Sequence, residues 1–115
     1  MKLMSLVESL NLTVRCCEEK LDSSVTGGYV GDLLSDVIAN SEKGNVWITI
    51  QSHQNIVAVA ELKEHSGIIL VLNREPDKET VKKAEKAGIP ILSSALPCFE
   101  VAGKVYELMK RVIYL

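Results

Sequence analysis

The segment Gly67-Ile68-Ile69-Leu70-Val71-Leu72 (residues 67–72) is the strongest indication of the fold class of this chain. It is an almost unbroken apolar run, in which no polar side chain alternates with the branched ones. A strand with one face in water shows that alternation, whereas a strand covered on both faces does not, and parallel sheets consist of strands of the second kind. The run therefore predicts a buried strand in a parallel sheet that carries helices on its faces.

The segments on either side of this run alternate between strand and helix patterns, which is typical of an α/β domain. Gly88 follows a charged helical segment and is expected to end it. The predicted elements are a helix at 2–10, a strand at 12–17, a strand and glycine turn at 23–29, a helix from 32, a strand at 46–50, helices at 55–63 and 76–87, a short strand at 89–92 and a helix at 98–114.

Length and composition fit one ordinary globular domain. The chain has 115 residues, of which 47% are hydrophobic and 24% charged. Its formal net charge of -2 provides no bulk attraction to nucleic acid or to an anionic membrane, so neither partner is expected. The sequence contains no apolar stretch of membrane-spanning length and no signal-peptide pattern, and a cytoplasmic location is therefore expected.

The three cysteines predict neither a disulfide nor a metal site. Cys16 and Cys17 are neighbours, and on a strand their side chains are expected to point to opposite faces. Cys98 stands apart from both, so no set of ligands has the spacing of a zinc or iron-sulfur site. We expect free thiols in a reducing compartment, no metal and no cofactor.

Ligands of open parallel sheets bind beyond the carboxyl ends of the strands, and three junctions in the sequence are candidates. The first holds Thr26, Gly27 and Gly28, where two glycines allow the backbone to approach a ligand closely or simply make a tight turn. No lysine follows at the spacing of a phosphate-binding loop. We expect these residues at the carboxyl edge of the sheet.

The second junction follows the strand predicted at 46–50 and is the most polar one. Gln51, His53 and Asn55 place amide and imidazole groups just before an apolar helix. Either Ser52 or His53 could cap that helix, while the remaining groups could contact a planar or phosphorylated ligand. The other histidine, His65, is expected to be exposed in a loop.

The third junction contains Asn73 and Arg74, and Ser94 closes the same edge. Arg74 is predicted to be the only fixed cation there, where it suits a phosphate or a carboxylate, although pairing with Glu75 or Asp77 is an equally good interpretation. Ser94 adds a hydroxyl donor. These residues complete a set of ligand-binding candidates: Thr26, Gly27, Gly28, Gln51, His53, Asn55, Asn73, Arg74 and Ser94.

An alternative function would use the thiol of Cys98. At the first turn of a helix its pKa could be lowered by the helix dipole, and His53 or Asp32 could serve it in a small redox accessory or enzyme. A small buried side chain is the simpler interpretation of Cys98. Because a nucleophile needs a base and an orienting group, and the sequence shows no such set, no catalytic residue is assigned.

The order of the junctions from Val25 to Tyr106 resembles the DRTGG domain. The resemblance is carried by VTGGYVGDLLSDVIAN (25–40), VWITIQSHQNIVAVA (46–60), GIILVLNREPD (67–77) and AGIPILSSALPCFEVAGKVYEL (87–108). The chain looks like a stand-alone relative of the modules found in phosphotransacetylases and CBS-containing pyrophosphatases, and it is similar to the N-terminal domain of HPr kinase. Where the fused modules carry Gly-Asp-Arg and Thr-Gly-Gly, this chain has Ser52-His53-Gln54 and Leu72-Asn73-Arg74.

This resemblance implies a single three-layer α/β/α domain with a mainly parallel sheet, a regulatory or ligand-sensing role, and dimerisation. It implies no kinase activity, since the phosphate-binding sequence GxxxxGK[ST] is absent. We therefore expect a non-catalytic module that binds a nucleotide or phosphorylated metabolite and acts through a homodimer or a protein partner. The apolar segments Val112–Leu115 and Ile56–Leu62 are the expected dimer surfaces.

Overall fold

The structure is a computed structural model that describes the backbone of residues 1–114 and the side chains of residues 1–111. The side chains of the expected dimer segment Val112–Leu115 lie outside the described residues. The elements are α1 (Leu3–Leu10), β1 (Thr13–Cys16), the 3-10 helix η1 (Glu18–Lys20), β2 (Gly27–Val30), α2 (Leu34–Asn40), β3 (Asn45–Thr49), α3 (Asn55–Leu62), β4 (Gly67–Leu70), α4 (Lys78–Ala87), β5 (Ile91–Ser93) and α5 (Cys98–Tyr114).

The five strands form one sheet in the order β1-β5-β4-β3-β2. Strands β2 to β5 are parallel to their neighbours, and β1 is antiparallel to β5. All four residues of β4 are buried, which confirms the prediction from the apolar run that a strand covered on both faces lies within a parallel sheet.

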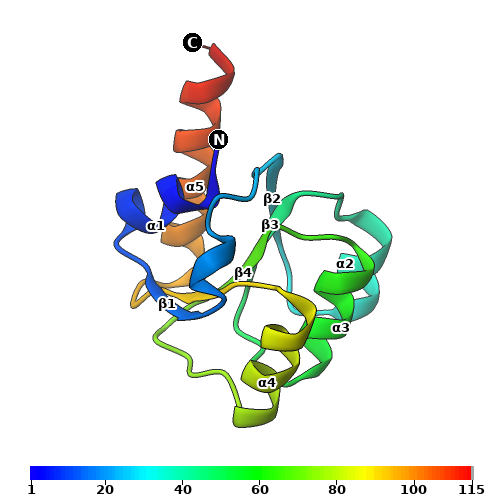
Figure 1. The fold of residues 1–115 in the computed structure, drawn as a ribbon. Helices are drawn as coiled ribbons and strands as arrows, with labels where there is room; N and C mark the ends of the chain where they lie inside the picture. Colours follow the sequence, from blue (N-terminus) through cyan, green and yellow to red (C-terminus); the bar gives the residue numbers. More distant parts are fainter. Residues whose placement is uncertain (115) are drawn as a thin grey trace.

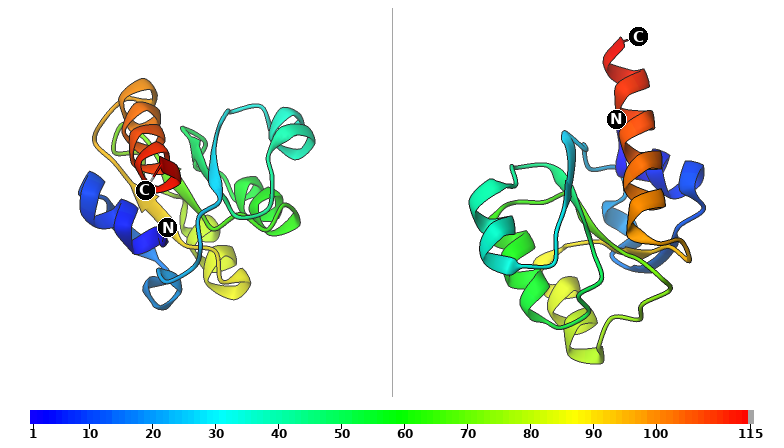
Figure 2. Two further views of the ribbon diagram at one scale, coloured as in Figure 1. Left: turned by 90° about the horizontal axis from the view of Figure 1, so that it is seen from above. Right: turned by 180° about the vertical axis from the view of Figure 1, so that it is seen from behind.

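The topology divides the helices between the two faces of the sheet (Figures 1 and 2). From β2 to β5 each strand lies beside the one before it and on the same side, so right-handed connections place α2, α3 and α4 on one face. The other face is left to α1 and α5. The predicted three-layer α/β/α architecture is confirmed.

Each face has its own apolar core. Leu3 and Leu6 of α1 pack with Val101 and Val105 of α5 on one face, and Val37 of α2 belongs to the core of the other. Among the described residues, no helix is long and apolar enough to cross a membrane. Gly88 ends α4 in the left-handed conformation, at a φ of 71°, as its position predicted.

Two local predictions were wrong. Gly27 and Gly28 do not form a turn after a strand, because they are themselves the first residues of β2. Cys16 and Cys17 do not point to opposite faces, because the register of β1 shifts between Val14 and Cys16, and Cys17 has a positive φ of 61°. Both thiols consequently donate to carbonyls near the end of α4, Cys16 to Ile89 and Cys17 to Ala84.

The expected surplus of apolar surface on α3 is also absent. Ile56, Val57, Val59 and Ala60 are buried in the core beneath the helix. Only Leu62, at its end, is a strongly exposed large apolar residue of this segment. Helix α3 is therefore a core helix and gives no support to a dimer surface at this position.

His65 is buried, contrary to the expectation of an exposed loop residue, with 5% of its surface exposed. Its ring meets Trp47 edge-on at 5.7 Å, and its Nε2 lies 2.8 Å from Ser41 Oγ. Because the Ser41 hydroxyl donates to the carbonyl of Val37, Nε2 is the donor to Ser41. His65 Nδ1 then remains a buried acceptor with no partner.

This environment predicts acid sensitivity. Burial, followed by the charge of Lys63, lowers the pKa of His65 to about 4 from 6.5. Between these pH values the unfolded chain binds a proton that the folded chain does not. The contribution of neutral His65 to stability is therefore complete above pH 6.5 and falls as the pH drops toward 4, by about 3 kcal/mol in all.

Urea unfolding, followed by the fluorescence of buried Trp47, measures this effect from pH 7 to pH 4. We expect the unfolding free energy of His65→Gln to decrease less steeply with falling pH than that of the unchanged protein. The matched control is His53→Gln, which removes an exposed imidazole and is expected to leave the slope in place. Equal slopes for the unchanged protein and His65→Gln would contradict the assignment.

Candidate functional site

The four loops that follow β2, β3, β4 and β5 meet at the carboxyl edge of the parallel strands and are joined by hydrogen bonds. Asp32, after β2, accepts from the backbone N–H of Ile50 after β3 at 3.0 Å. The Ser52 carbonyl accepts from the N–H of Asp77, and the N–H of Asn73 donates to the Ser94 carbonyl at 2.8 Å. These bonds link all four loops into one preorganised edge.

Asp32 is the main anchor of this edge. Its Oδ1 accepts from Thr49 Oγ1 at 2.7 Å as well as from Ile50, and its backbone carbonyl accepts from Gln51 Nε2 at 2.9 Å. The candidate Gln51 is thus held against Asp32. An exposed carboxylate at this position repels an anion placed beside it, so an anionic group is better accommodated toward β4 and β5.

His53 and Asn55 lie at the start of α3, and both are exposed. The N–H of Asn55 donates to His53 Nδ1 at 3.2 Å. This contact agrees with one of the two interpretations from the sequence, in which His53 caps this helix. In the neutral ring the hydrogen is then on Nε2. His53 therefore has one nitrogen engaged with its own helix and one donor left for a ligand.

Asn73 and Arg74 follow β4 in a strained turn. Leu72 and Asn73 both have positive φ, at 56° and 53°, and the N–H of Arg74 donates back to the carbonyl of Val71 at 3.1 Å. Asparagine tolerates this conformation, whereas leucine does so at a cost, and strain of this kind is often found at functional sites. Arg74 is exposed, and its Nε donates to the Ile50 carbonyl at 3.3 Å.

Arg74 is not the only fixed cation near this edge, contrary to the prediction. Arg15 of β1 is half-buried, donates through Nε to Ser93 Oγ at 2.8 Å and pairs with Glu75 at 3.1 Å. No pattern in the sequence indicates this position of Arg15, because it depends on β1 lying antiparallel beside β5. Glu75 is thus engaged by Arg15 and not by Arg74.

Ser94 is buried, and its hydroxyl oxygen accepts from the N–H of Leu96 at 3.1 Å. Its contact shapes the loop between β5 and α5. The three remaining candidates, Thr26, Gly27 and Gly28, lie at the opposite end of β2, so their predicted place at the carboxyl edge was wrong. There Thr26 donates to the Lys43 carbonyl at 2.8 Å, and its hydroxyl oxygen accepts from Asn45.

The thiol of Cys98 lacks the features of an activated nucleophile. Burial, and then the negative charge of Asp32, raises its pKa, which is the opposite of the shift that a helix dipole alone would cause. Among the hydrogen bonds of the described residues, none joins this thiol to His53 or Asp32. The described part of the chain also contains no cluster of three or more His, Cys, Asp or Glu side chains that could hold a metal.

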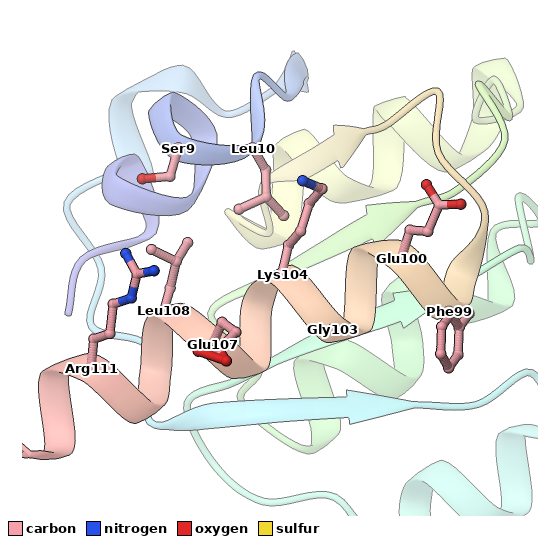
Figure 3. Close-up of a pocket in the computed structure, with 9 residues that line it drawn as sticks. All are labelled: Ser9, Leu10, Phe99, Glu100, Gly103, Lys104, Glu107, Leu108 and Arg111. Atoms are coloured by element: carbon pink, nitrogen blue, oxygen red, sulfur yellow. The ribbon is translucent and has the colours of Figure 1, made fainter.

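Two cavities lie elsewhere, on either side of α5. One, of about 590 Å³, lies between the end of α1 and α5, and the charged side chains along α5 border it (Figure 3). The other, of about 560 Å³, lies between α5 and β2. Thr26, Gly27 and Gly28 line this second groove, so the structure places them at a different surface from the other candidates.

No protein-family model matches the chain, and no curated protein matches it in sequence. Among solved structures, it is similar to the crystal structure of the CBS and DRTGG domains of the regulatory region of Clostridium perfringens pyrophosphatase, complexed with the activator diadenosine tetraphosphate. The TM-score is 0.73 at 17% sequence identity, over 90% of this chain and 45% of that chain.

At this identity the likeness concerns the fold. The chain shares its fold with part of a regulatory region that includes a DRTGG domain, which is consistent with the resemblance drawn from the sequence. It spans 45% of the length of that structure's chain.

The thiols provide a direct test of the site chemistry. Burial raises the pKa of Cys16 and Cys98 and raises that of Cys17 to about 12, so few thiolates are present near neutral pH. We expect all three to react with iodoacetamide at pH 7.5 more slowly than free cysteine does, and to reach its rate in denaturant. Mass spectrometry of the peptides follows each residue, and fast labelling of Cys98 would revive the nucleophile hypothesis.

Proposed function

We propose that this protein is a non-catalytic regulatory module that senses a small anionic ligand, such as a nucleotide or phosphorylated metabolite, at the carboxyl edge of its sheet. The observation that carries the proposal is the set of hydrogen bonds that joins the loops after all four parallel strands. A preorganised edge reduces the entropy that a ligand would otherwise lose on ordering its site. The free thiols suit the reducing cytoplasm as its location.

The part of this edge toward β4 and β5 suits an anion best. Arg74 is exposed and engages only its Nε among the contacts of the described residues, so the rest of its guanidinium can form charge-assisted bonds. The free Nε2 of His53 and the side chain of Asn73 add donors. Hydrogen bonds to charged groups contribute about 1.5–3 kcal/mol each, enough for specific recognition by a few side chains.

The similar solved structure supports the ligand class by analogy. The regulatory region of the pyrophosphatase was crystallised with an adenine dinucleotide activator. Because the fold of this chain matches part of that region, adenine nucleotides are the first ligands to test. In the same analogy, the module passes its signal to a second copy of itself or to a protein partner.

Binding is tested by the thermal unfolding of the full chain with ATP, diadenosine tetraphosphate or inorganic phosphate. A ligand at 100 times its dissociation constant stabilises the folded state by about 2.7 kcal/mol, which raises Tm by several degrees in a domain of this size. We expect at least one of the nucleotides to do so.

Variants then locate the site. Arg74→Ala and His53→Ala are expected to reduce the ligand-induced rise, and Arg74→Lys to keep part of it. Lys83→Ala is the matched control, since Lys83 is an exposed cation of α4 beside a different cavity, and it is expected to keep the full rise. A rise that survives both alanine substitutions would move the ligand away from this edge, and no rise with any compound would favour a module that binds only proteins.

The absence of catalysis is tested separately. We expect no turnover of nucleoside triphosphates or phosphomonoesters, because the described residues at the edge include no paired base and nucleophile. Turnover in a phosphate-release assay that is lost in Asp32→Asn but kept in Lys83→Ala would contradict the proposal.

A further inference from the structure

The outer face of α5 is not covered by any part of the described chain. Val101 and Val105 on its inner face are buried, whereas Phe99 is 89% exposed and Tyr106 is 68% exposed. A Cβ added at Gly103, between these two aromatic residues, would meet nothing within 4 Å. Glycine within a helix costs roughly 1 kcal/mol relative to alanine, and packing inside this chain gives no reason for it here.

On the side of α5 that faces β2, this surface continues into the groove of about 560 Å³. The groove is open because β2 pairs on one side only, and α5 leaves Val30 of this strand 46% exposed. An aromatic side chain has a surface area of about 150–250 Å², so Phe99 and Tyr106 together expose about 300 Å² to solvent. That is more than a third of the 800 Å² or so that each partner contributes to a standard interface.

On the opposite side of α5, four charged residues form a row along the groove beside α1 (Figure 3). They are Glu100, Lys104, Glu107 and Arg111, at spacings of four, three and four residues, and their signs alternate. None of the ion pairs among the described residues involves any of the four. The row is therefore free to meet charges from outside the chain.

This row of charges is complementary to the same row on a second α5 that runs in the opposite direction. If a second α5 runs antiparallel to the first, Glu100 lies opposite Arg111 of the second copy, and Lys104 lies opposite its Glu107. A parallel second helix would place like charges opposite each other in every pair. The alternation thus selects an antiparallel neighbour with the same sequence, which is the arrangement that a two-fold axis produces.

We infer that α5 is the dimer contact of this protein and pairs with α5 of a second copy in antiparallel orientation, about a two-fold axis between residues 105 and 106. Gly103 and Tyr106 of both helices lie within one turn of this axis, so an exposed aromatic side chain and an open position of each copy lie near the centre of the contact. The inference rests on the dimer of the proposed function and assigns it a surface. It places the contact on α5 and not on α3.

The test uses charge swaps in the full chain and reads the dimer dissociation constant by sedimentation equilibrium. Lys104→Glu alone and Glu107→Lys alone each put like charges opposite each other twice per dimer, and each is expected to weaken dimerisation about tenfold. The double variant Lys104→Glu/Glu107→Lys restores opposite charges and is expected to recover the original constant. The two single variants, once mixed, are expected to pair with each other.

Two further variants separate the interface from folding. Gly103→Leu adds bulk at the open position near this axis, where the chain itself offers room, so it is expected to weaken dimerisation at least tenfold while Tm of the dilute protein rises or stays constant. Lys83→Glu makes the same change of charge as Lys104→Glu on α4, and it is expected to leave the dissociation constant unchanged.

The outcomes distinguish this inference from the proposed function. A dimer whose dissociation constant is unaffected by Lys104→Glu and Gly103→Leu would overturn the α5 contact and leave the dimer itself in place. A monomer up to several hundred micromolar would overturn both, and α5 would then face a different partner or solvent. A rise of Tm with nucleotides can be measured in either case.

Discussion

The handedness of the connections between β2, β3, β4 and β5 determines which helices cover each face of the sheet. Each strand lies beside its predecessor and in the same direction, so right-handed crossovers place α2, α3 and α4 together on one face. The second face is then available only to α1 and α5. Because two helices do not cover five strands, the sheet remains open beside β2, and Val30 and the outer side of α5 are left exposed.

Sequence patterns predicted correctly those elements in which the local residues and the tertiary environment favour the same conformation. The run at 67–72 became the buried strand β4, and Gly88 ended α4, because burial on both faces and a left-handed helix end each have a direct signature in the residues involved. The glycines of β2 have no such signature, since glycine is disfavoured in strands and Gly27 and Gly28 belong to one only through pairing with β3.

The residues of the candidate site also divide into those that a local pattern predicts and those whose position depends on tertiary contacts. Gln51, His53, Asn55, Asn73 and Arg74 could be placed at the carboxyl edge because they directly follow parallel strands. The positions of Arg15 and His65 could not, because the first depends on the orientation of β1 and the second on a partner in a distant segment, Ser41. The paired orientation of Cys16 and Cys17 arises from one shift of register and one positive φ, and strand alternation cannot predict either.

The edge and the outer face of α5 are connected through the loop between β5 and α5. The N–H groups of Leu72 and Asn73 donate to the carbonyls of Leu96 and Ser94, so the strained turn before Arg74 is bonded to the residues that lead into α5. Phe99 lies in the first turn of that helix. A ligand that rearranges the turn therefore acts on the end of the surface proposed for dimerisation. By thermodynamic linkage, a ligand that tightens the dimer must itself bind the dimer more tightly than the monomer. With one site on each copy, saturating ligand strengthens dimerisation by the square of that ratio of affinities.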